Sequence, residues 1–343
     1  MRIVTLLTLG FASAISAADP VVSPDAKLEK LFDSGLVLTE GVAVAPDGMV
    51  YFSDITFTHF SRAEKKLIEA GHIWKFDPST GKATIFRSPS GMSNGLKFDA
   101  EGNLLAAEGA DFGGRRVTRT DMKTGKSYII AGLFDGKPFN SPNDISIDEK
   151  GRIYFSDPRY LGHEPIDQPV QAVYRIDTDG SIHRIITDAG KCNGVAVSPD
   201  QKTLYVVSND NGSNGIGRLR GKTDEGGEEP TRKGLMALLA YDLSPEGTAK
   251  FRKVLVDYAP EDGPDGMVCD TEGNVWTAVR AENRPGICCY SPDGKELGYI
   301  KTEIPTNVGF GRGAESKTLY ITAGKSLYRI KVNRDGYQLP AKR

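Results

Sequence analysis

The stretch Asn193-Gly194-Val195-Ala196-Val197 belongs to a short motif that recurs six times along the chain. Each copy begins with a side chain that carries an amide or carboxylate oxygen, and a short apolar run usually follows it. The copies are Glu40-Gly41-Val42, Asn94-Gly95-Leu96, Asn143-Asp144-Ile145, Asn193-Gly194-Val195, Asp265-Gly266-Met267 and Asn307-Val308-Gly309. Such internal repetition predicts an array of similar structural units.

The spacing of the copies indicates which array this is. Successive copies start between 42 and 54 residues apart, apart from one interval of 72 residues. Each unit continues with a second strand such as Tyr154-Phe155-Ser156-Asp157, a third such as Ala172–Ile176, a turn and an outer strand. Periods of this length with four strands per unit are typical of propeller blades. We therefore predict an all-β fold, a six-bladed β-propeller with four antiparallel strands per blade.

A ring of blades has to be closed, and the segment before the first motif can close it. We expect Lys27–Phe32 to supply the outer strand of the blade that begins at Asn307, which would protect both strand edges. Residues 19–343 then form a single domain. The long interval holds Asn211–Gly234, which is rich in glycine and charge and is interpreted as a surface loop. Ser61–Ala70 is the one clear candidate for an amphipathic helix.

The N-terminus has the pattern of a secretory signal peptide. A basic residue, Arg2, precedes an apolar run, and Ser16-Ala17-Ala18 offers a small-residue cleavage site. We expect residues 1–18 to be removed and the mature protein to be secreted or periplasmic, with no membrane segment left. The net charge of −2 gives no reason to expect nucleic acid as a partner.

The four cysteines do not form a disulfide framework in the sequence. Cys288 and Cys289 are adjacent, while Cys192 and Cys269 lie in or beside predicted inner strands. A chain of this size does not need disulfides for stability. We interpret all four as buried thiols, and a Cys192–Cys269 bridge stays open as an alternative.

The repeat predicts where polar chemistry gathers. Each motif residue is expected just before an inner strand, so six oxygen-bearing side chains would converge at one mouth of the channel, a suitable site for a hard cation. The second strand of each blade returns to the same face and ends in a wider polar ring of Asp54, Glu108, Asp157, Asn209 and Arg280. His59 follows shortly after Asp54 and is a further candidate for this pocket.

Other interpretations of these residues carry less weight. Asn, Asp and Gly are also common turn formers, but Glu40 is not, and six copies in register favour side-chain chemistry. Gly91-Met92-Ser93-Asn94-Gly95 matches the nucleophile elbow of serine hydrolases, yet it precedes a strand instead of following one. The histidines show no zinc-ligand spacing.

These residues carry a resemblance to a known family. The segments Asn140-Ser141-Pro142-Asn143-Asp144, Cys192–Asp200 and Pro264-Asp265-Gly266-Met267 are similar to the senescence-marker protein/gluconolactonase/luciferin-regenerating-enzyme-like family, as is Gly151–Pro158. The resemblance covers roughly Glu40 to Ile330. It implies a six-bladed propeller with a calcium-type ion at the channel mouth, held by Glu40, Asn143, Asn193 and Asp265.

The resemblance also has limits at particular residues. Asn143 serves the substrate more than the metal in some relatives, and Asn94 and Asn307 are not standard ligands of the family. Some animal lactonases carry an arginine two positions before the equivalent of Asn143, where this chain has Ser141. The resemblance to that branch therefore does not fix the substrate.

Together the residues and the resemblance predict a metal-dependent lactonase. The ion, most simply Ca²⁺ but also Zn²⁺, Mn²⁺ or Mg²⁺, would polarise the carbonyl of a lactone or related small ester, and Asp265 would act as general base. The substrate pocket would be lined by His59, Glu108, Asp157 and Arg280. Two alternatives stay open: another metal-assisted esterase or phosphotriesterase, and a non-catalytic binding propeller with a structural ion.

Overall fold

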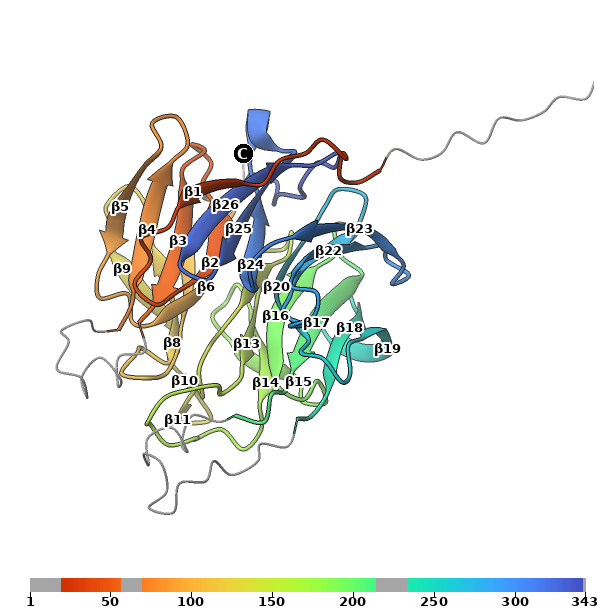
Figure 1. Cartoon of the computed structure of the whole chain (residues 1–343). Helices are drawn as coiled ribbons and strands as arrows, with labels where there is room; N and C mark the ends of the chain where they lie inside the picture. Colours follow the sequence, from red (N-terminus) through yellow and green to blue (C-terminus); the bar gives the residue numbers. More distant parts are fainter. Residues whose placement is uncertain (1–19, 57–69, 214–232, 342–343) are drawn as a thin grey trace, which may run out of the picture.

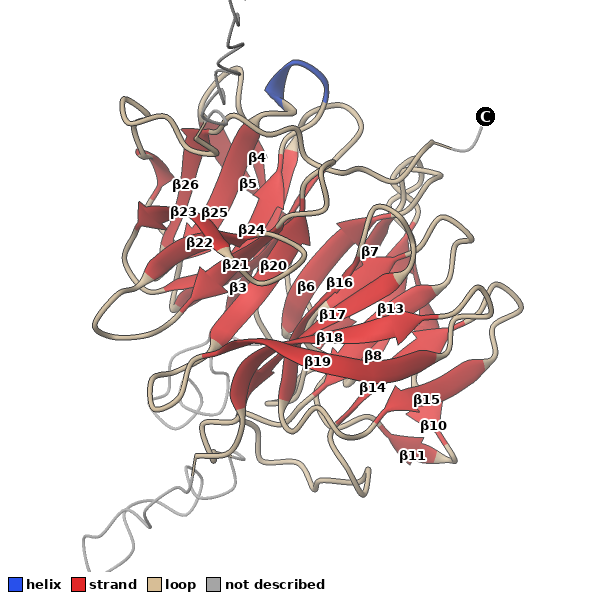
Figure 2. Ribbon diagram, turned by 90° about the vertical axis from the view of Figure 1, so that its right-hand side faces the viewer, coloured by secondary structure: helices blue, strands red, loops and turns tan. Residues whose placement is uncertain are grey.

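A computed structural model describes residues 20–56, 70–213 and 233–341. These residues form six four-stranded sheets. Figure 1 shows the sheets arranged as blades around a centre, and Figure 2 shows that strands dominate the molecule. Each sheet has four antiparallel strands in simple order from the inside to the outside, with one exception at the ring closure. The predicted six-bladed β-propeller is confirmed.

The strands fall into six sheets along the chain. The first blade contains β2 (Leu38–Val44), β3 (Val50–Ile55), β4 (His72–Asp77) and β5 (Lys82–Arg87). The second contains β6 (Ser93–Phe98), β7 (Leu104–Glu108), β8 (Arg116–Thr120) and β9 (Ser127–Ala131). The third contains β12 (Ile145–Ile147), β13 (Ile153–Asp157), β14 (Ala172–Ile176) and β15 (Ile182–Ile186). The next two are β16 (Cys192–Val197), β17 (Thr203–Asn209), β18 (Met236–Leu243) and β19 (Ala249–Asp257); and β20 (Pro264–Cys269), β21 (Val275–Val279), β22 (Gly286–Tyr290) and β23 (Glu296–Lys301).

The sixth blade joins the two ends of the propeller. It contains β24 (Pro305–Phe310), β25 (Thr318–Ala323), β26 (Ser326–Lys331) and, as its outer strand, β1 (Glu29–Phe32). Two short elements lie outside the blades, the hairpin of β10 (Leu133–Phe134) and β11 (Lys137–Pro138), and the 3-10 turn η1 (Gly313–Glu315). Within the described residues, no helix has the length and apolar character needed to cross a membrane.

The pairing of β1 with β26 confirms the predicted closure by the N-terminal strand. Figure 1 shows the two strands side by side, red against blue. Phe32 of β1 also packs against the neighbouring first blade, with ring centroids 5.2 Å from Phe52 and 5.0 Å from Trp74. Aromatic pairs of this kind contribute about 0.5–1.5 kcal/mol each beyond the area they bury. The strand therefore links the last blade to the first.

The six inner strands form a closed ring around the central channel. β2, β6, β12, β16, β20 and β24 each contact the next strand in this order, and β24 contacts β2. Glycines in the motif permit this approach. A Cβ on Gly41 would lie 2.2 Å from the carbonyl oxygen of Asn94, and one on Gly194 would lie 2.5 Å from that of Asp265. Both distances are too short for any side chain.

We expected every motif residue to precede its inner strand, but most of them lie within it. Five of the inner strands contain an irregularity of register at the motif, for example between Glu40 and Val42 in β2 and between Pro264 and Met267 in β20. Only Asn143 lies ahead of its strand, β12. A β-bulge redirects a side chain out of the regular alternation. The irregularity therefore accompanies the motif in five blades, whereas Asn143 lies in the segment before β12.

The four cysteines are buried and free. Burial raises the pKa of the Cys192 thiol and of the Cys269 thiol, each to about 12. The interpretation as buried thiols is confirmed, and the alternative Cys192–Cys269 bridge is not formed. Three other expectations fall wholly or largely outside the described residues: the signal peptide, the helix Ser61–Ala70 and most of the insertion Asn211–Gly234.

Candidate functional site at one mouth of the channel

A cavity of about 220 Å³ opens at the end of the channel where the motif residues lie. We call it the motif cavity. Its polar lining residues are Glu40, Asn94, Ser141, Asn143, Tyr160, Asn193, Asn209, Asn211, Asp262, Asp265 and Arg280. Apolar residues, among them Leu38, Ile55, Met92 and Leu161, complete the wall. All four residues predicted as metal ligands therefore line one cavity, together with Arg280; Asn307 is absent from its lining.

Two carboxylates lie close together in this cavity and are not equivalent. Asp265 accepts a hydrogen bond from Arg280, with Oδ2 2.9 Å from Nη1. Glu40 Oε2 is buried and has no hydrogen-bond partner among the residues that the structure describes. Burial and the charge of Asp265 raise the pKa of Glu40 well above its ordinary value. Burial also raises the pKa of Asp265, although Arg280 partly offsets this effect. With both carboxylates ionised, the pair would carry more negative charge than Arg280 alone neutralises.

The amide of Asn193 is held by an aromatic hydroxyl. Its Nδ2 donates to the hydroxyl oxygen of Tyr160 at 3.2 Å, while that hydroxyl donates to the backbone carbonyl of Asn209 at 2.9 Å. Because the hydroxyl proton is used by Asn209, Tyr160 can only accept from Asn193. The nitrogen of the Asn193 amide is therefore directed toward Tyr160, which leaves the amide oxygen as the group available to a ligand.

The donor set fits a hard divalent cation. A buried carboxylate oxygen without a partner is unusual in a folded protein and needs an explanation. Two carboxylates and two amides offer only oxygen ligands, the type that Ca²⁺ and similar ions prefer. The described residues contain no cluster of three or more His, Cys, Asp and Glu side chains suited to a metal. Amides are not part of that pattern, and half of this set consists of amides.

The second ring of polar residues divides into two groups. Arg280 and Asn209 line the motif cavity. Asp157, by contrast, is fully buried and accepts hydrogen bonds from the backbone N–H groups of Asn140 and Ser141 at 2.8 and 2.7 Å. Burial raises the pKa of Asp157 to about 7. Asp157 does not line the motif cavity but fixes the loop that carries Asn143.

Glu108 is also placed elsewhere than the predicted substrate pocket. Its carboxylate forms ion pairs with Arg87 at 2.5 Å and Arg116 at 2.7 Å, and it lines a separate groove with both arginines. Asp54 likewise accepts hydrogen bonds from the backbone of Leu36 and from Trp74. Strand ends alone therefore do not identify cavity residues, because several of these carboxylates bind neighbouring loops and side chains. His59 lies outside the described residues.

Some cavity residues were not found from the sequence. Tyr160 follows β13, the second strand of the third blade, and lies outside both the motif and the strand end. Ser141 was noted only as a departure from the animal lactonases, yet it lines the cavity and its hydroxyl accepts a hydrogen bond from the Ala110 N–H at 2.9 Å. Asp262 precedes the fifth motif by three residues. A search limited to the repeat cannot find residues of this kind.

The structure is thus a six-bladed propeller with a polar cavity at one mouth of its channel, and comparisons with known proteins identify its family. The family model described as "SMP-30/Gluconolactonase/LRE-like region" matches residues 38–325. The chain belongs to this family.

Individual relatives give the same picture. The chain is 29% identical to a gluconolactonase of Zymomonas mobilis over 312 residues, which cover 84% of this chain and 79% of that protein. It is 28% identical over 268 residues to a pentonolactonase of Haloferax volcanii, covering 76% and 77%. A solved gluconolactonase structure from Xanthomonas campestris superposes with a TM-score of 0.70 at 24% identity over 92% of this chain and 96% of that one, which shows the shared fold.

Proposed function

We propose that this chain is a metal-dependent lactonase that opens a small cyclic ester in the motif cavity. The observation that carries the proposal is the convergence of four motif side chains from four blades on one cavity beside Arg280. Family membership and the lactonase relatives make the chain a hydrolase acting on ester bonds. The size of the cavity and its mixed polar and apolar wall suit a small molecule.

The cavity residues would hold one divalent cation through their oxygens. The ligands would be Glu40, Asn143, Asn193 and Asp265, and Ca²⁺ is the ion best suited to such a set. A cation bound there would supply Lewis-acid polarisation of the ester carbonyl. It would also relieve the repulsion that raises the pKa of Glu40.

Asp265 is the proposed general base. Its carboxylate accepts a proton from a water molecule as the water oxygen bonds to the carbonyl carbon of the lactone. The ring C–O bond then breaks, and the proton passes to the leaving alkoxide oxygen to give a hydroxy acid. A positioned general base typically contributes about 10²–10⁴-fold to the rate.

Two neighbours prepare Asp265 and the ligands for this role. Arg280 donates to one carboxylate oxygen of Asp265, which favours its ionised form and fixes its orientation. Tyr160 fixes the Asn193 amide from outside the proposed ligand set.

Location is a separate proposal: we infer secretion or periplasmic export from the N-terminal sequence. N-terminal sequencing of protein from its native host would then start near Asp19.

The function is tested with a panel of substrates and a chelator. Purified protein is assayed on five- and six-membered sugar lactones, on an aryl ester and on a phosphotriester, before and after metal removal and after Ca²⁺ is restored. We expect lactone hydrolysis that is lost with chelator and recovered with metal. Preference for the aryl ester or phosphotriester would favour the other hydrolase hypothesis. Metal-dependent thermal stabilisation without any hydrolysis would favour the binding propeller.

A further inference from the structure

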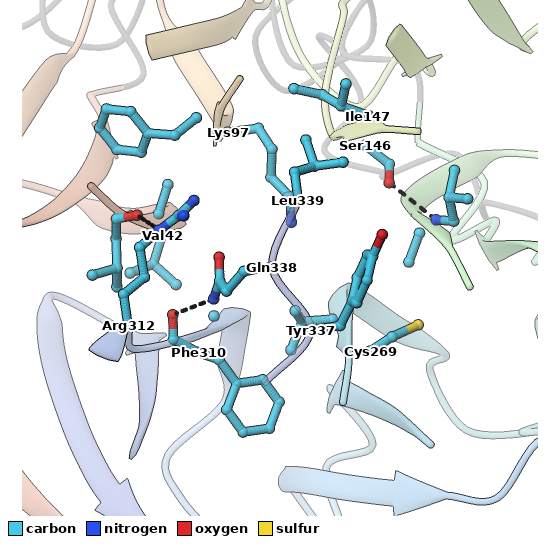
Figure 3. A pocket seen from close by; sticks show the side chains of 17 residues that line it. Val42, Lys97, Ser146, Ile147, Cys269, Phe310, Arg312, Tyr337, Gln338 and Leu339 are labelled. Atoms are coloured by element: carbon cyan, nitrogen blue, oxygen red, sulfur yellow. Dashed lines mark hydrogen bonds between the residues drawn. The ribbon is translucent and has the colours of Figure 1, made fainter. Parts of the chain in front are cut away.

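The opposite end of the channel contains a second, smaller cavity with a different character. The motif cavity lies at the beginning of the inner strands, whereas this cavity of about 50 Å³ is lined by their ends. The lining strand residues are Val42–Val44, Lys97–Phe98, Ser146–Ile147, Ala196–Val197, Val268–Cys269 and Gly309–Phe310. Arg312, Tyr337, Gln338 and Leu339 complete the wall. Figure 3 shows this arrangement from close by.

A segment near the C-terminus crosses this end of the channel. We call Gly336–Leu339 the strap, and the cavity beneath it the strap cavity. The N–H of Gly336 donates to the carbonyl of Ser316 at 2.8 Å, and that of Tyr337 donates to the carbonyl of Cys269 at 3.1 Å. Gln338 Nε2 donates to the carbonyls of Phe310 and Gly311.

Two cationic side chains enter the strap cavity. Lys97 of β6 and Arg312, just after β24, both point toward the space around Gln338 (Figure 3). Neither forms an ion pair with any residue in the part of the chain that the structure describes. The only hydrogen bond of the Arg312 side chain within this part runs from Nε to the Val44 carbonyl at 2.7 Å. The Nη groups of Arg312 and the ammonium of Lys97 remain as available donors.

The two cations are close enough to repel each other. Burial lowers the pKa of Lys97; the charge of Asp144 opposes this shift, and the charge of Arg312 adds a smaller lowering effect. Burial also lowers the pKa of Arg312. Asp144 is the acidic group that acts on Lys97, but its Oδ2 already accepts a hydrogen bond from the Val195 N–H at 3.0 Å. Two partly desolvated like charges without a paired counter-ion are unfavourable in a protein interior.

We propose that the strap cavity binds a small oxyanion between Lys97 and Arg312. A negative ligand would neutralise the two cations and would accept charge-assisted hydrogen bonds from both. Ser146 also lines this cavity; its Oγ accepts from the Val197 N–H at 3.0 Å, which leaves its own hydroxyl proton as a further donor in the wall. The arginine fork suits the geometry of phosphate and carboxylate oxygens.

The size of the cavity restricts the ligand. One water-sized sphere needs roughly 10–15 Å³, so about 50 Å³ accommodates only a few non-hydrogen atoms. An ion such as inorganic phosphate fits this limit, whereas a sugar acid does not. The site is thus distinct from the lactone site in charge, in size and in position along the channel. It does not depend on the proposed lactonase function.

The probe for this site is inorganic phosphate. Metal-depleted full-chain protein is titrated by calorimetry in buffers of constant ionic strength set with chloride, and its melting temperature is followed in parallel. We expect saturable binding of one phosphate per chain and a rise in melting temperature. Lys97→Met and Arg312→Met should each weaken phosphate binding at least about tenfold, which corresponds to the loss of one strong charge-assisted contact. The matched control is Lys75→Met, a half-buried strand lysine away from both cavities.

The variants also make a prediction without the ligand. In chloride alone, Lys97→Met should melt at a higher temperature than the wild type because it removes a cation that burial disfavours, and phosphate should reduce or reverse that difference. Absence of saturable binding to the wild type would overturn the proposal, as would unchanged binding to folded Lys97→Met and Arg312→Met, or an equal response to chloride. If a methionine variant fails to fold, Lys97→Gln and Arg312→Gln take its place. If the wild type shows no saturable phosphate binding, that titration alone overturns the proposal, whatever the variants do.

Discussion

The two ends of the central channel are built by the same six inner strands, yet they differ in charge, size and closure. At the motif cavity, bulges turn side chains such as Glu40 and Asp265 inward, and the cavity measures about 220 Å³. At the strap cavity the strands have returned to regular pairing, the space measures about 50 Å³, and Gly336–Leu339 covers it. One end presents an excess of acidic groups, and the other presents two cations.

The comparison teaches where a propeller places its chemistry. A regular strand alternates its side chains and fills the channel with small apolar residues such as Val42 and Ala196. Polar side chains reach the axis as a set at the end where five of the six inner strands carry a register irregularity. The acidic end is therefore a property of the repeat, while the cationic end depends on single residues, Lys97 and Arg312, and on a segment outside the blades.

The largest expected effect is the difference in activity between variants of the two carboxylates of the motif cavity. Asp265→Asn should lower kcat for a lactone by at least about a hundredfold at saturating metal, because an amide keeps a ligand oxygen but cannot accept a proton from water. Glu40→Gln should instead weaken metal binding and regain activity as metal is added. The measurement is kcat as a function of Ca²⁺ concentration, with metal affinity determined by calorimetry.

A carboxylate of the same cavity supplies the control for this prediction. Asp262 lines the wall but pairs with Lys233 at 2.5 Å and takes no part in the proposed chemistry, so Asp262→Asn should have little effect on kcat. Equal rescue of Asp265→Asn and Glu40→Gln by metal would show that Asp265 is only a ligand. The general base would then have to be sought among other residues, with His59 as the next candidate.

A smaller effect is expected from the residue that holds the Asn193 amide. Tyr160→Phe removes one acceptor of Asn193 Nδ2 and leaves the hydrogen bond of the Asn193 side chain to Asp265, so the amide oxygen is less firmly presented. Loss of such an outer partner typically lowers metal affinity about 10–100-fold, and we expect the lower end for a single neutral hydrogen bond. Calorimetric titration with Ca²⁺ measures it, and kcat at saturating metal should change little.

A second buried tyrosine provides the comparison for Tyr160. The hydroxyl of Tyr241 donates to Asp188 at 2.9 Å, away from both cavities. Tyr241→Phe should therefore leave the metal affinity unchanged while removing one hydrogen bond. If both variants lower metal affinity equally, the effect of Tyr160→Phe is general destabilisation and its positioning role is wrong.

The repeat explains why the fold could be predicted from the sequence. The motif and its spacing predicted the number of blades, and the segment before the first motif predicted the closing strand. Both depend on local sequence pattern and on the geometry of a closed ring. The repeat also placed Glu40 and Asp265 at one mouth. It did not show that β-bulges aim these residues, since a bulge changes register without changing composition.

The rest of the site could not be predicted because it depends on contacts between blades. Asp157 and Glu108 end equivalent strands, but one binds backbone N–H groups and the other binds two arginines. Equivalent sequence positions therefore have different partners. Tyr160 and the strap lie in irregular segments, where neither strand periodicity nor the repeat constrains the path of the chain.

The smallest expected effect tests whether the two ends of the channel are independent. The hydroxyl of Tyr337 in the strap donates to Glu149 Oε1 at 2.8 Å and accepts from Gln201 Nε2 at 3.1 Å. Tyr337→Phe removes both contacts, and each hydrogen bond contributes about 0.5–1.5 kcal/mol, less where water can replace it. For a chain of this size a loss near 1 kcal/mol lowers the melting temperature by about 2 °C.

The activity of Tyr337→Phe tests whether the two ends of the channel act independently. Because the strap lies at the opposite end from the proposed lactone site, kcat and KM for a lactone should equal those of the wild type, as should the Ca²⁺ affinity. Tyr128→Phe, which changes an exposed tyrosine of β9, controls for removing a phenol hydroxyl, and its melting temperature should not move. A change in kcat for Tyr337→Phe that Tyr128→Phe does not share would mean that the inner strands transmit strain from one end to the other. The acidic and cationic ends would then be parts of one coupled channel instead of two separate sites.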